Sequence, residues 1–298
     1  MPRGPNVGPH EAVLWRGGAL TLGSFDAEPE SEDFETAGAV GDRPAIAFSR
    51  SAVGIAQEKR EAVVSDGTVA VLHNPRHPYR RFRVDRSGDH CEWISVEPEV
   101  LLGVNPRLGR DPRRPFAAAS VPLSRRTAAL VRLVARHVRE AGPPDDLWVE
   151  ETLLGALANL TPGRERGRTR ATRRHETLVR SVRELLAARP EQPWTVGAIA
   201  KVVGASPYHA CRVFRRGTGY SLHAYLTEQR LRRALVLLGE GGRNVRAIAF
   251  VLGFSSHSHF TASFRRAFGV SPSDFRGAAT AERIRSLAAR LKAMEFPP

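Results

Sequence analysis

Polar and aromatic side chains recur around residue 210 at a spacing that places them on one face of a helix. This face consists of Tyr208, Cys211, Arg212 and Arg215. A guanidinium in such a position can donate two hydrogen bonds to the edge of a guanine, which discriminates between bases by about 1–3 kcal/mol. We therefore predict that Arg212 reads a base. Arg215 and Arg216, near the helix end, are expected to contact phosphates, and His209 on the flank suits either role.

A second face of the same kind follows in residues 257–268. It consists of Ser258, Thr261, Ala262 and Arg265, with His259 at its edge. Because these side chains are smaller and less charged, we expect the first face to supply most of the base discrimination. The second face is expected mainly to position the protein, through Arg265, Arg266 and the amides at the helix N-terminus.

Both faces belong to a sequence repeat. Residues 199–225 are echoed by residues 248–275, with an offset of 49 before the turn and 50 after it, so the second turn is one residue longer. Each copy has the order helix, glycine turn, capped helix and Phe-Arg-Arg, which predicts two helix-turn-helix units. Residues 221–238 are predicted to form a connecting helix of about 27 Å, comparable with the spacing of about 34 Å between successive major grooves. The sequence thus favours two grooves contacted by one chain.

The ends of these helices are marked by residues with specific backbone roles. Thr195 and Asn244 are expected to cap the two support helices, and Ser206 to cap the first recognition helix. Gly204 and Gly253 can supply the positive φ that each turn requires.

Charge is distributed unevenly along the chain. Residues 1–120 contain 15 Lys+Arg and 17 Asp+Glu, a net charge of −2, whereas residues 121–298 contain 30 and 14, a net charge of +16. This asymmetry gives the second part the electrostatic character of a nucleic-acid binder.

The first part has a different pattern. Residues 12–104 contain short runs rich in β-branched residues, broken by Gly, Pro and Asp. Such runs predict a small antiparallel β-domain, either a barrel or a sandwich. The sequence Ser65-Asp66-Gly67 is expected to form the turn of a β-hairpin.

Helical spacing follows the strands. Ser124 is expected to cap a helix ending near Glu140, and residues 147–160 form the second helix of an antiparallel pair. Residues 161–174 are basic and contain Gly and Pro, which predicts a linker able to contact DNA backbone. A helix over residues 175–188 then leads into the repeats, and a basic amphipathic tail helix is predicted near the C-terminus.

The C-terminal third resembles a known family. Residues 178–276, and above all IAFVLGFSSHSHFTASFRRAFGVSPSDFR, resemble the DNA-binding domain of the AraC/XylS-type bacterial transcription regulators. The resemblance implies DNA-facing roles for Tyr208, Cys211, Arg212, Ser258, His259 and Thr261. Two positions depart from the family pattern: Ala262 stands where many relatives have arginine, and Cys211 replaces a residue that commonly forms hydrogen bonds.

The N-terminal part resembles the cupin-like sensing domain of the same family through VLHNPRHPYRRF and DHCEWISV. The resemblance implies an α+β multidomain protein whose β-domain binds a small-molecule effector and whose helical pair dimerises. Its expected partners are double-stranded promoter DNA, the effector, a second copy and, as a further candidate, RNA polymerase. The expected segments are a β effector domain (1–120), a dimerising helical pair (121–160), a flexible linker (161–174), a DNA-binding domain (175–277) and a basic helical tail (278–298).

Two other readings concern the β-domain. His73, His77, His90 and Cys91 are close in sequence and suggest a metal-dependent cupin enzyme fused to a DNA-binding module. However, His73-x-x-x-His77 lacks the His-x-His, Glu and later His of such sites, so we expect no metal, no cofactor and no enzymatic activity. The third reading is a β-domain that dimerises and binds no effector.

The composition also bears on location. The chain has two cysteines, no apolar run long enough for a membrane span, and no apolar core of a signal peptide at its start. We therefore expect a cytoplasmic protein without a membrane partner.

Overall fold

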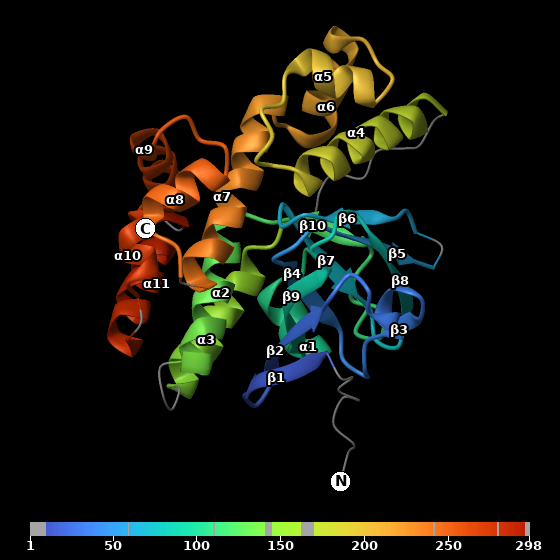
Figure 1. The fold of residues 1–298 in the computed structure, drawn as a ribbon. Coiled ribbons are helices and arrows are strands. Elements are labelled where there is room, and N and C mark those ends of the chain that lie inside the picture. Colours follow the sequence, from blue (N-terminus) through green and yellow to red (C-terminus); the bar gives the residue numbers. More distant parts are fainter. Residues whose placement is uncertain are drawn as a thin grey trace. The chain divides into compact units, whose positions relative to one another are not determined.

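The computed structural model describes residues 10–58, 60–109, 111–140, 145–161, 170–240, 242–278 and 280–295. The chain divides into two compact units, residues 1–163 with 264–298 and residues 164–263 (Figure 1). No helix among the described residues is long and apolar enough to cross a membrane.

Two antiparallel sheets form the body of the first unit (Figure 1). The larger sheet has the order β1 (Glu11–Arg16), β2 (Leu20–Ala27), β9 (Asp89–Val96), β4 (Ala45–Ser49), β7 (Val69–His73) and β10 (Ser120–Pro122). The smaller sheet has the order β3 (Ala37–Ala39), β8 (Pro78–Arg83), β5 (Val53–Gln57) and β6 (Val63–Ser65), and a short η1 (Glu32–Phe34) and α1 (Pro98–Val104) accompany the strands. Within the described residues neither sheet closes on itself, so the predicted antiparallel β-domain is a sandwich and not a barrel.

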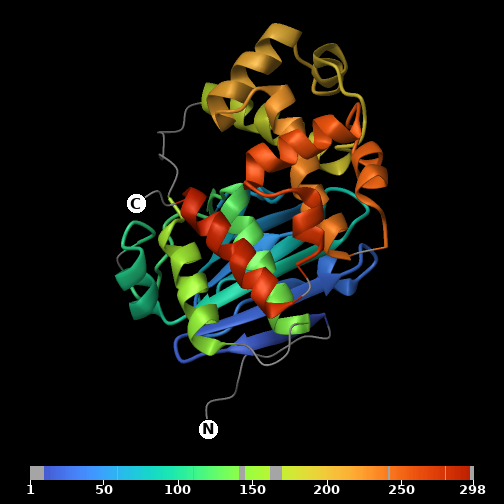
Figure 2. The same ribbon diagram turned by 90° about the vertical axis from the view of Figure 1, so that its left-hand side faces the viewer.

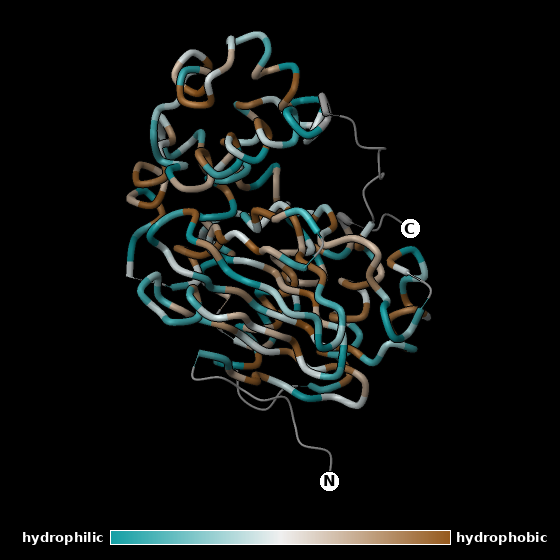
Figure 3. Tube along the Cα trace, turned by 90° about the vertical axis from the view of Figure 1, so that its right-hand side faces the viewer, coloured by the Kyte–Doolittle hydropathy of each residue, from teal (hydrophilic) through white to brown (hydrophobic). Residues whose placement is uncertain are grey.

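Side chains alternate between the two faces of a strand, and the larger sheet carries buried apolar residues on both of its faces. On β9, Ile94 belongs to an apolar cluster with the helices of this unit, whereas Cys91 and Trp93 belong to a separate cluster with residues of β2. Val71 of β7 packs with Val53 of β5, which joins the two sheets. Figure 3 shows the resulting mixture of apolar and polar positions along the strands.

The predicted hairpin at residues 65–67 is wrong in its strand pairing. β6 pairs with β5 of the smaller sheet, whereas β7 pairs with β4 and β10 of the larger one. The turn chemistry itself is present, since Gly67 has a φ of 80° and the Asp66 carboxylate accepts a hydrogen bond of 2.9 Å from the Thr68 amide. A turn determines a local reversal of the chain but not which strand edges the flanking residues join.

The predicted helical pair is confirmed as α2 (Arg125–Glu140) and α3 (Asp146–Ala158). The Ser124 hydroxyl accepts a hydrogen bond of 3.0 Å from the Thr127 amide, and the Asp145 carboxylate caps α3 through the Trp148 amide. Both helices place apolar side chains against the larger sheet.

The remaining described helices follow along the chain. They are α4 (Arg170–Ala188), α5 (Val196–Val202), α6 (Pro207–Thr218), α7 (Leu222–Glu240), α8 (Val245–Val251), α9 (His257–Phe268), α10 (Pro272–Arg276) and, as the tail helix, α11 (Ala281–Glu295), with α4 as the entry to the repeats. α4 begins five residues before the predicted helix, so residues 170–174 of the predicted linker are helical, and residues 162–169 lie outside the described residues. The predicted segment boundaries stay expectations.

Candidate nucleic-acid interface

The two predicted turns close with the same backbone hydrogen bond. The Ala205 amide donates to the Ala200 carbonyl at 2.9 Å, and the Phe254 amide donates to the Ala249 carbonyl at 3.0 Å. The glycines of these turns are Gly204, with a φ of 64°, and Gly253, with a φ of 74°. Because a positive φ strains other residues, glycine allows each support helix to end abruptly and the next helix to leave at a defined angle.

Each helix of the two units starts at a side-chain cap. The predicted caps Thr195, Ser206 and Asn244 accept hydrogen bonds of 3.1, 3.3 and 2.7 Å from backbone amides in the following turn. Ser256 caps α9 in the same way, accepting 3.1 Å from the His259 amide. The caps therefore fix the residue at which each recognition helix begins.

The first helix-turn-helix unit is held together by a core of aromatic and aliphatic side chains. The Phe214 ring of α6 packs edge-on against Tyr225 of α7, with 5.1 Å between ring centroids. Ile199 of α5 and Val182 of α4 belong to the same buried cluster. These contacts turn the remaining face of α6 outward.

The structure brings all six predicted contact residues of the first unit onto α6. Tyr208 is 77% exposed, although an aromatic side chain normally avoids water. Arg212, Arg215 and Arg216 are exposed, whereas Cys211 and His209 are half-buried. The His209 ring lies 5.7 Å from that of His175 on α4. One aromatic and three guanidinium groups on a helix without a carboxylate form a cationic surface suited to the major groove.

The predicted contact residues of the second unit lie on α9. Ser258, His259, Arg265 and Arg266 are exposed, and Thr261 is half-buried. The Thr261 hydroxyl is 3.5 Å from His257 Nε2, and the Ser255 hydroxyl is 3.3 Å from His259 Nδ1. The two arginines occupy the last turn of α9, so the polar side chains of its earlier turns carry hydroxyl and imidazole groups.

The connecting helix α7 carries a side chain that sequence reasoning missed. The Arg230 guanidinium donates to the carbonyl oxygens of Pro190, Gln192 and Gly253 at 2.7, 2.9 and 2.9 Å. It thereby joins the segment before α5, the connecting helix and the second turn. Burial lowers the pKa of Arg230, which the carboxylate of Glu191 opposes.

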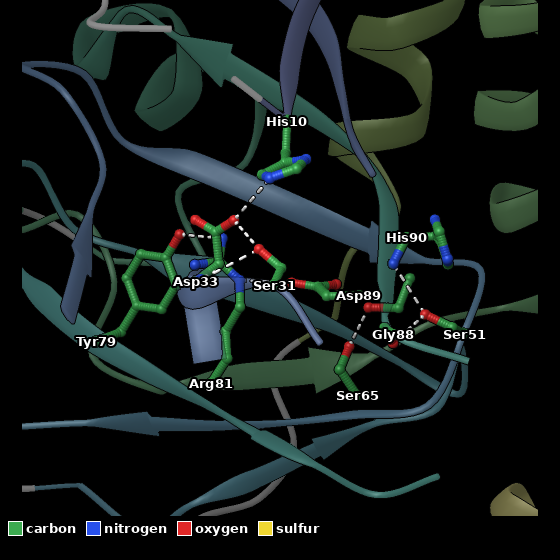
Figure 4. A network of polar contacts seen from close by, with 11 residues as sticks. His10, Ser31, Asp33, Ser51, Ser65, Tyr79, Arg81, Gly88, Asp89 and His90 are labelled. Carbon is green, nitrogen blue, oxygen red and sulfur yellow. Dashed lines mark hydrogen bonds and ion pairs between the residues drawn. The ribbon is translucent and has the colours of Figure 1, made fainter. Parts of the chain in front are cut away.

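The interior between the sheets of the β-domain holds a polar network (Figure 4). Arg81 Nε donates to Asp89 Oδ2 at 2.7 Å, and Arg81 Nη2 donates to the Tyr79 hydroxyl at 2.8 Å. The Arg81 guanidinium also lies 4.0 Å above the ring of Phe25. Burial raises the pKa of Tyr79 to about 12 and lowers that of the adjoining His73 to about 3. His73 is therefore neutral at physiological pH.

The four residues considered for a metal site do not form one. His73 faces the interior, where its ring lies 4.5 Å from that of Tyr79, while His90 Nδ1 is 3.0 Å from Asp26 Oδ1 on another part of the sheet. His90 and Cys91 are neighbours on β9 and point to opposite faces. In the described ranges, no three or more His, Cys, Asp or Glu side chains are grouped so that they could hold a metal ion.

Comparisons with known proteins agree with this geometry. A model of a helix-turn-helix domain matches residues 199–278. The chain is 33% identical over 102 residues to the regulatory protein SoxS of Salmonella typhimurium, a match that covers 34% of this chain and 95% of SoxS. The chain belongs to the AraC type of helix-turn-helix regulators.

Other relatives match a similar share of this AraC-type chain. The HTH-type transcriptional regulator GlxA of Rhizobium meliloti is 40% identical over 98 residues, which covers 32% of this chain and only 30% of GlxA. A crystal structure of a Chromobacterium violaceum regulator with an AraC-type DNA-binding domain is 29% identical, covers 36% of this chain and 95% of that chain, and has a TM-score of 0.34.

Two features of this AraC-type chain had weak sequence signals. Arg230 stands among several arginines of α7, and only the distant carbonyls that it contacts distinguish it from Arg233. Arg81 and Asp89 lie on neighbouring runs of the β-domain with nothing in their spacing to indicate a pair. A signal was available for Ser256, because Ser206 has the equivalent position in the first copy.

Proposed function

We propose that this chain is a sequence-specific DNA-binding transcription regulator whose β-domain receives a small-molecule effector. The observation that carries the proposal is the pair of capped helix-turn-helix units with matched turns, each with a polar face in solvent. A basic surface attracts phosphates at any sequence, whereas the exposed arginine and aromatic side chain of α6 can distinguish base edges.

The proposed contacts fall into three groups. Tyr208 and Arg212 are exposed in the first half of α6, whereas the half-buried Cys211 packs in part against the core of this unit. All three are proposed to lie against base edges. The arginines at the helix ends are proposed to contact phosphates: Arg215, Arg216, Arg265 and Arg266. His209, Ser258, His259 and Thr261 complete the proposed surface with neutral groups that can donate or accept hydrogen bonds.

The proposed effector site is the polar interior of the β-domain. The groups between the sheets offer a guanidinium, a phenol, a carboxylate and a neutral imidazole, supplied by Arg81, Tyr79, Asp89 and His73. A small molecule that replaces one of these internal contacts would change the packing of the two sheets. Such a ligand stabilises the folded chain by an amount that grows with the logarithm of its concentration above its dissociation constant, so a thermal-shift screen of small molecules on the full chain tests this step.

The remaining partners are proposed on narrower grounds. A second copy is proposed to pair through the helical pair, and Leu147, which is 76% exposed on α3, supplies an apolar side chain for that contact. RNA polymerase is the proposed partner during transcription control, and a cytoplasmic location follows from a chromosomal target.

A mobility-shift experiment tests the central proposal. The purified full chain is mixed with labelled fragments of promoters from its own genome in the presence of excess heparin. Specific binding leaves a subset of fragments retarded, because base contacts add to the phosphate attraction that heparin removes. If heparin releases every fragment equally, the chain is not a sequence-specific regulator.

A further inference from the structure

The tail helix α11 buries a complete apolar stripe. Its four inward side chains recur at the spacing of one helix face, and each is at most 4% exposed: Ile284, Leu287, Ala288 and Leu291. α11 packs along α2 within the compact unit that contains the two sheets (Figure 2). Burying each leucine or isoleucine contributes about 1.5–3 kcal/mol, so apolar contact is the main attraction between the tail and the helical pair.

α2 has a second apolar face besides the one on the sheet. Val131 and Val134 belong to the cluster that packs on the larger sheet. Leu130, Leu133 and His137 are also buried but lie on another side of α2, since successive residues turn by about 100°. An amphipathic helix with one layer to cover needs only one such face. Two helices, α3 and α11, contact α2 besides the sheet, which accounts for its second buried face.

Charge complements this contact along α3. Arg285 Nη1 lies 3.3 Å from Asp145 Oδ2, and Lys292 Nζ lies 3.7 Å from Glu151 Oε1. Pairs that are this exposed contribute only about 0–1 kcal/mol each. These two pairs orient α11. They also neutralise Arg285 and Lys292, whose charges would otherwise be available to a polyanion.

One buried group opposes the docking of α11. His137 is 1% exposed and packs edge-on against Trp148, yet among the described residues neither of its ring nitrogens has a hydrogen-bond partner. Burial and the neighbouring Arg285 lower the pKa of His137, while Asp145 acts in the opposite direction. Burying an unsatisfied polar group has an unfavourable free energy, so His137 reduces the stability of the packing around it.

The chain ties this contact to the second helix-turn-helix unit. Residues 277–280 separate α10 from α11 and span at most about 14 Å. Arg290 Nη2 also donates to the carbonyl oxygen of Gly269, just after α9, at 3.2 Å. Docking of α11 therefore attaches the segment that follows α9 to the helical pair.

We propose that α11 is an autoinhibitory clasp, an inference that rests on the proposed DNA-binding function. In the docked state it restrains the end of the second helix-turn-helix unit and keeps Arg285 and Lys292 on the carboxylates of Asp145 and Glu151. When α11 leaves α2, the unit gains freedom to follow a second groove and both cations become available to phosphates. DNA and the helical pair thus compete for the same helix.

Three full-length variants test the clasp. Leu291→Asp places a charge in the buried stripe and is expected to open the clasp, whereas Ala289→Asp adds the same charge on the exposed side of α11 and serves as the matched control. His137→Leu removes the unsatisfied group and is expected to close the clasp more firmly. Hydrogen exchange should be at least tenfold faster in the α11 amides of Leu291→Asp and several-fold slower in those of His137→Leu, with unchanged protection in the sheets.

DNA binding supplies the second measurement. On a specifically bound promoter fragment, Leu291→Asp should bind several-fold more tightly than Ala289→Asp, with a salt dependence steeper by up to about two phosphate contacts. His137→Leu should bind several-fold more weakly than the unsubstituted chain. Equal affinities for Leu291→Asp and Ala289→Asp, or weaker binding by Leu291→Asp, would overturn the clasp while the DNA-binding function stands. If the unsubstituted chain shows no specific binding, the proposed function fails, and the exchange measurement alone reports whether α11 undocks.

Discussion

The guanidinium of Arg230 donates a hydrogen bond of 2.9 Å to the carbonyl oxygen of Gly253. The same side chain also bonds to Pro190 and Gln192, so one residue of the connecting helix fixes both the approach to the first unit and the turn of the second. No other residue type offers donors spread over such a planar group.

Replacing Arg230 by Met should therefore loosen the DNA-binding segment. We expect a loss of stability of at least about 1.5 kcal/mol, the contribution of one hydrogen bond from a charged donor, measured by urea unfolding of the full chain. Arg233→Met on the same helix is the control, since Arg233 has no hydrogen bond or ion pair within the described ranges. Equal losses in the two variants would show that Arg230 contributes only its alkyl packing.

The two turn glycines provide a comparison within one molecule. A Cβ at Gly204 would meet nothing within 4 Å, whereas a Cβ at Gly253 would lie 2.4 Å from the Glu191 carbonyl oxygen and 2.9 Å from Arg230 Nη2. Both positions have positive φ, which costs an alanine about 1–2 kcal/mol. We expect Gly204→Ala to show that cost alone and Gly253→Ala to lose about 1–3 kcal/mol more. Thermal unfolding of the two variants checks this order, and equal losses would contradict it.

Arg212 and Arg266 are expected to have different effects on DNA binding. Arg212→Ala should relax the base preference at one position of the site, because its outward guanidinium on α6 is proposed to contact a base edge. Arg266→Ala should weaken all sequences alike and reduce the salt slope by about one. Binding selection from a random library, repeated at several salt concentrations, separates the two effects. An unchanged preferred site for Arg212→Ala would show that α6 does not read bases through this residue.

His73 should make the stability of the β-domain depend on pH. Its folded-state pKa is about 3, below the ordinary value of 6.5, so the unfolded chain binds the proton more readily between these values. Stability should therefore be complete above pH 6.5 and fall on acidification, by up to about 1.4 kcal/mol per pH unit. His73→Phe keeps the ring volume and removes the titration. Urea unfolding from pH 4 to 8 should give a flatter profile for this variant, and parallel profiles would refute the assignment.

Local signals in the sequence predicted the helical part well. Thr195, Ser206 and Asn244 act within one turn of themselves, so their cap function depends on only a few neighbouring residues. The same holds for the positive-φ glycines. The repeat then supplied a second, independent copy of each signal, which is why the support and recognition helices could be delimited closely.

Contacts between distant residues were not predictable in this way. The turn at Asp66 predicted a reversal, but the pairing of β6 with β5 depends on which edges the rest of the two sheets leaves open. Arg230 and Arg81 find partners across loops and sheets, and no periodicity marks either residue. The apolar stripe of α11 predicted an amphipathic helix but not that α2 would receive it.

The extra residue in the second turn has a consequence for changing specificity. Ser206 and Ser256 cap the two recognition helices and are separated by 50 positions, whereas the support helices are separated by 49. If recognition residues were exchanged between α6 and α9 with the offset of 49 that relates the support helices, each side chain would be placed one position away from its equivalent. One position corresponds to a rotation of about 100° around the helix, which would turn the side chain away from the face that is proposed to read DNA. Exchanges between α6 and α9 should therefore be counted from the capping serines, with Tyr208 taking the place of Ser258.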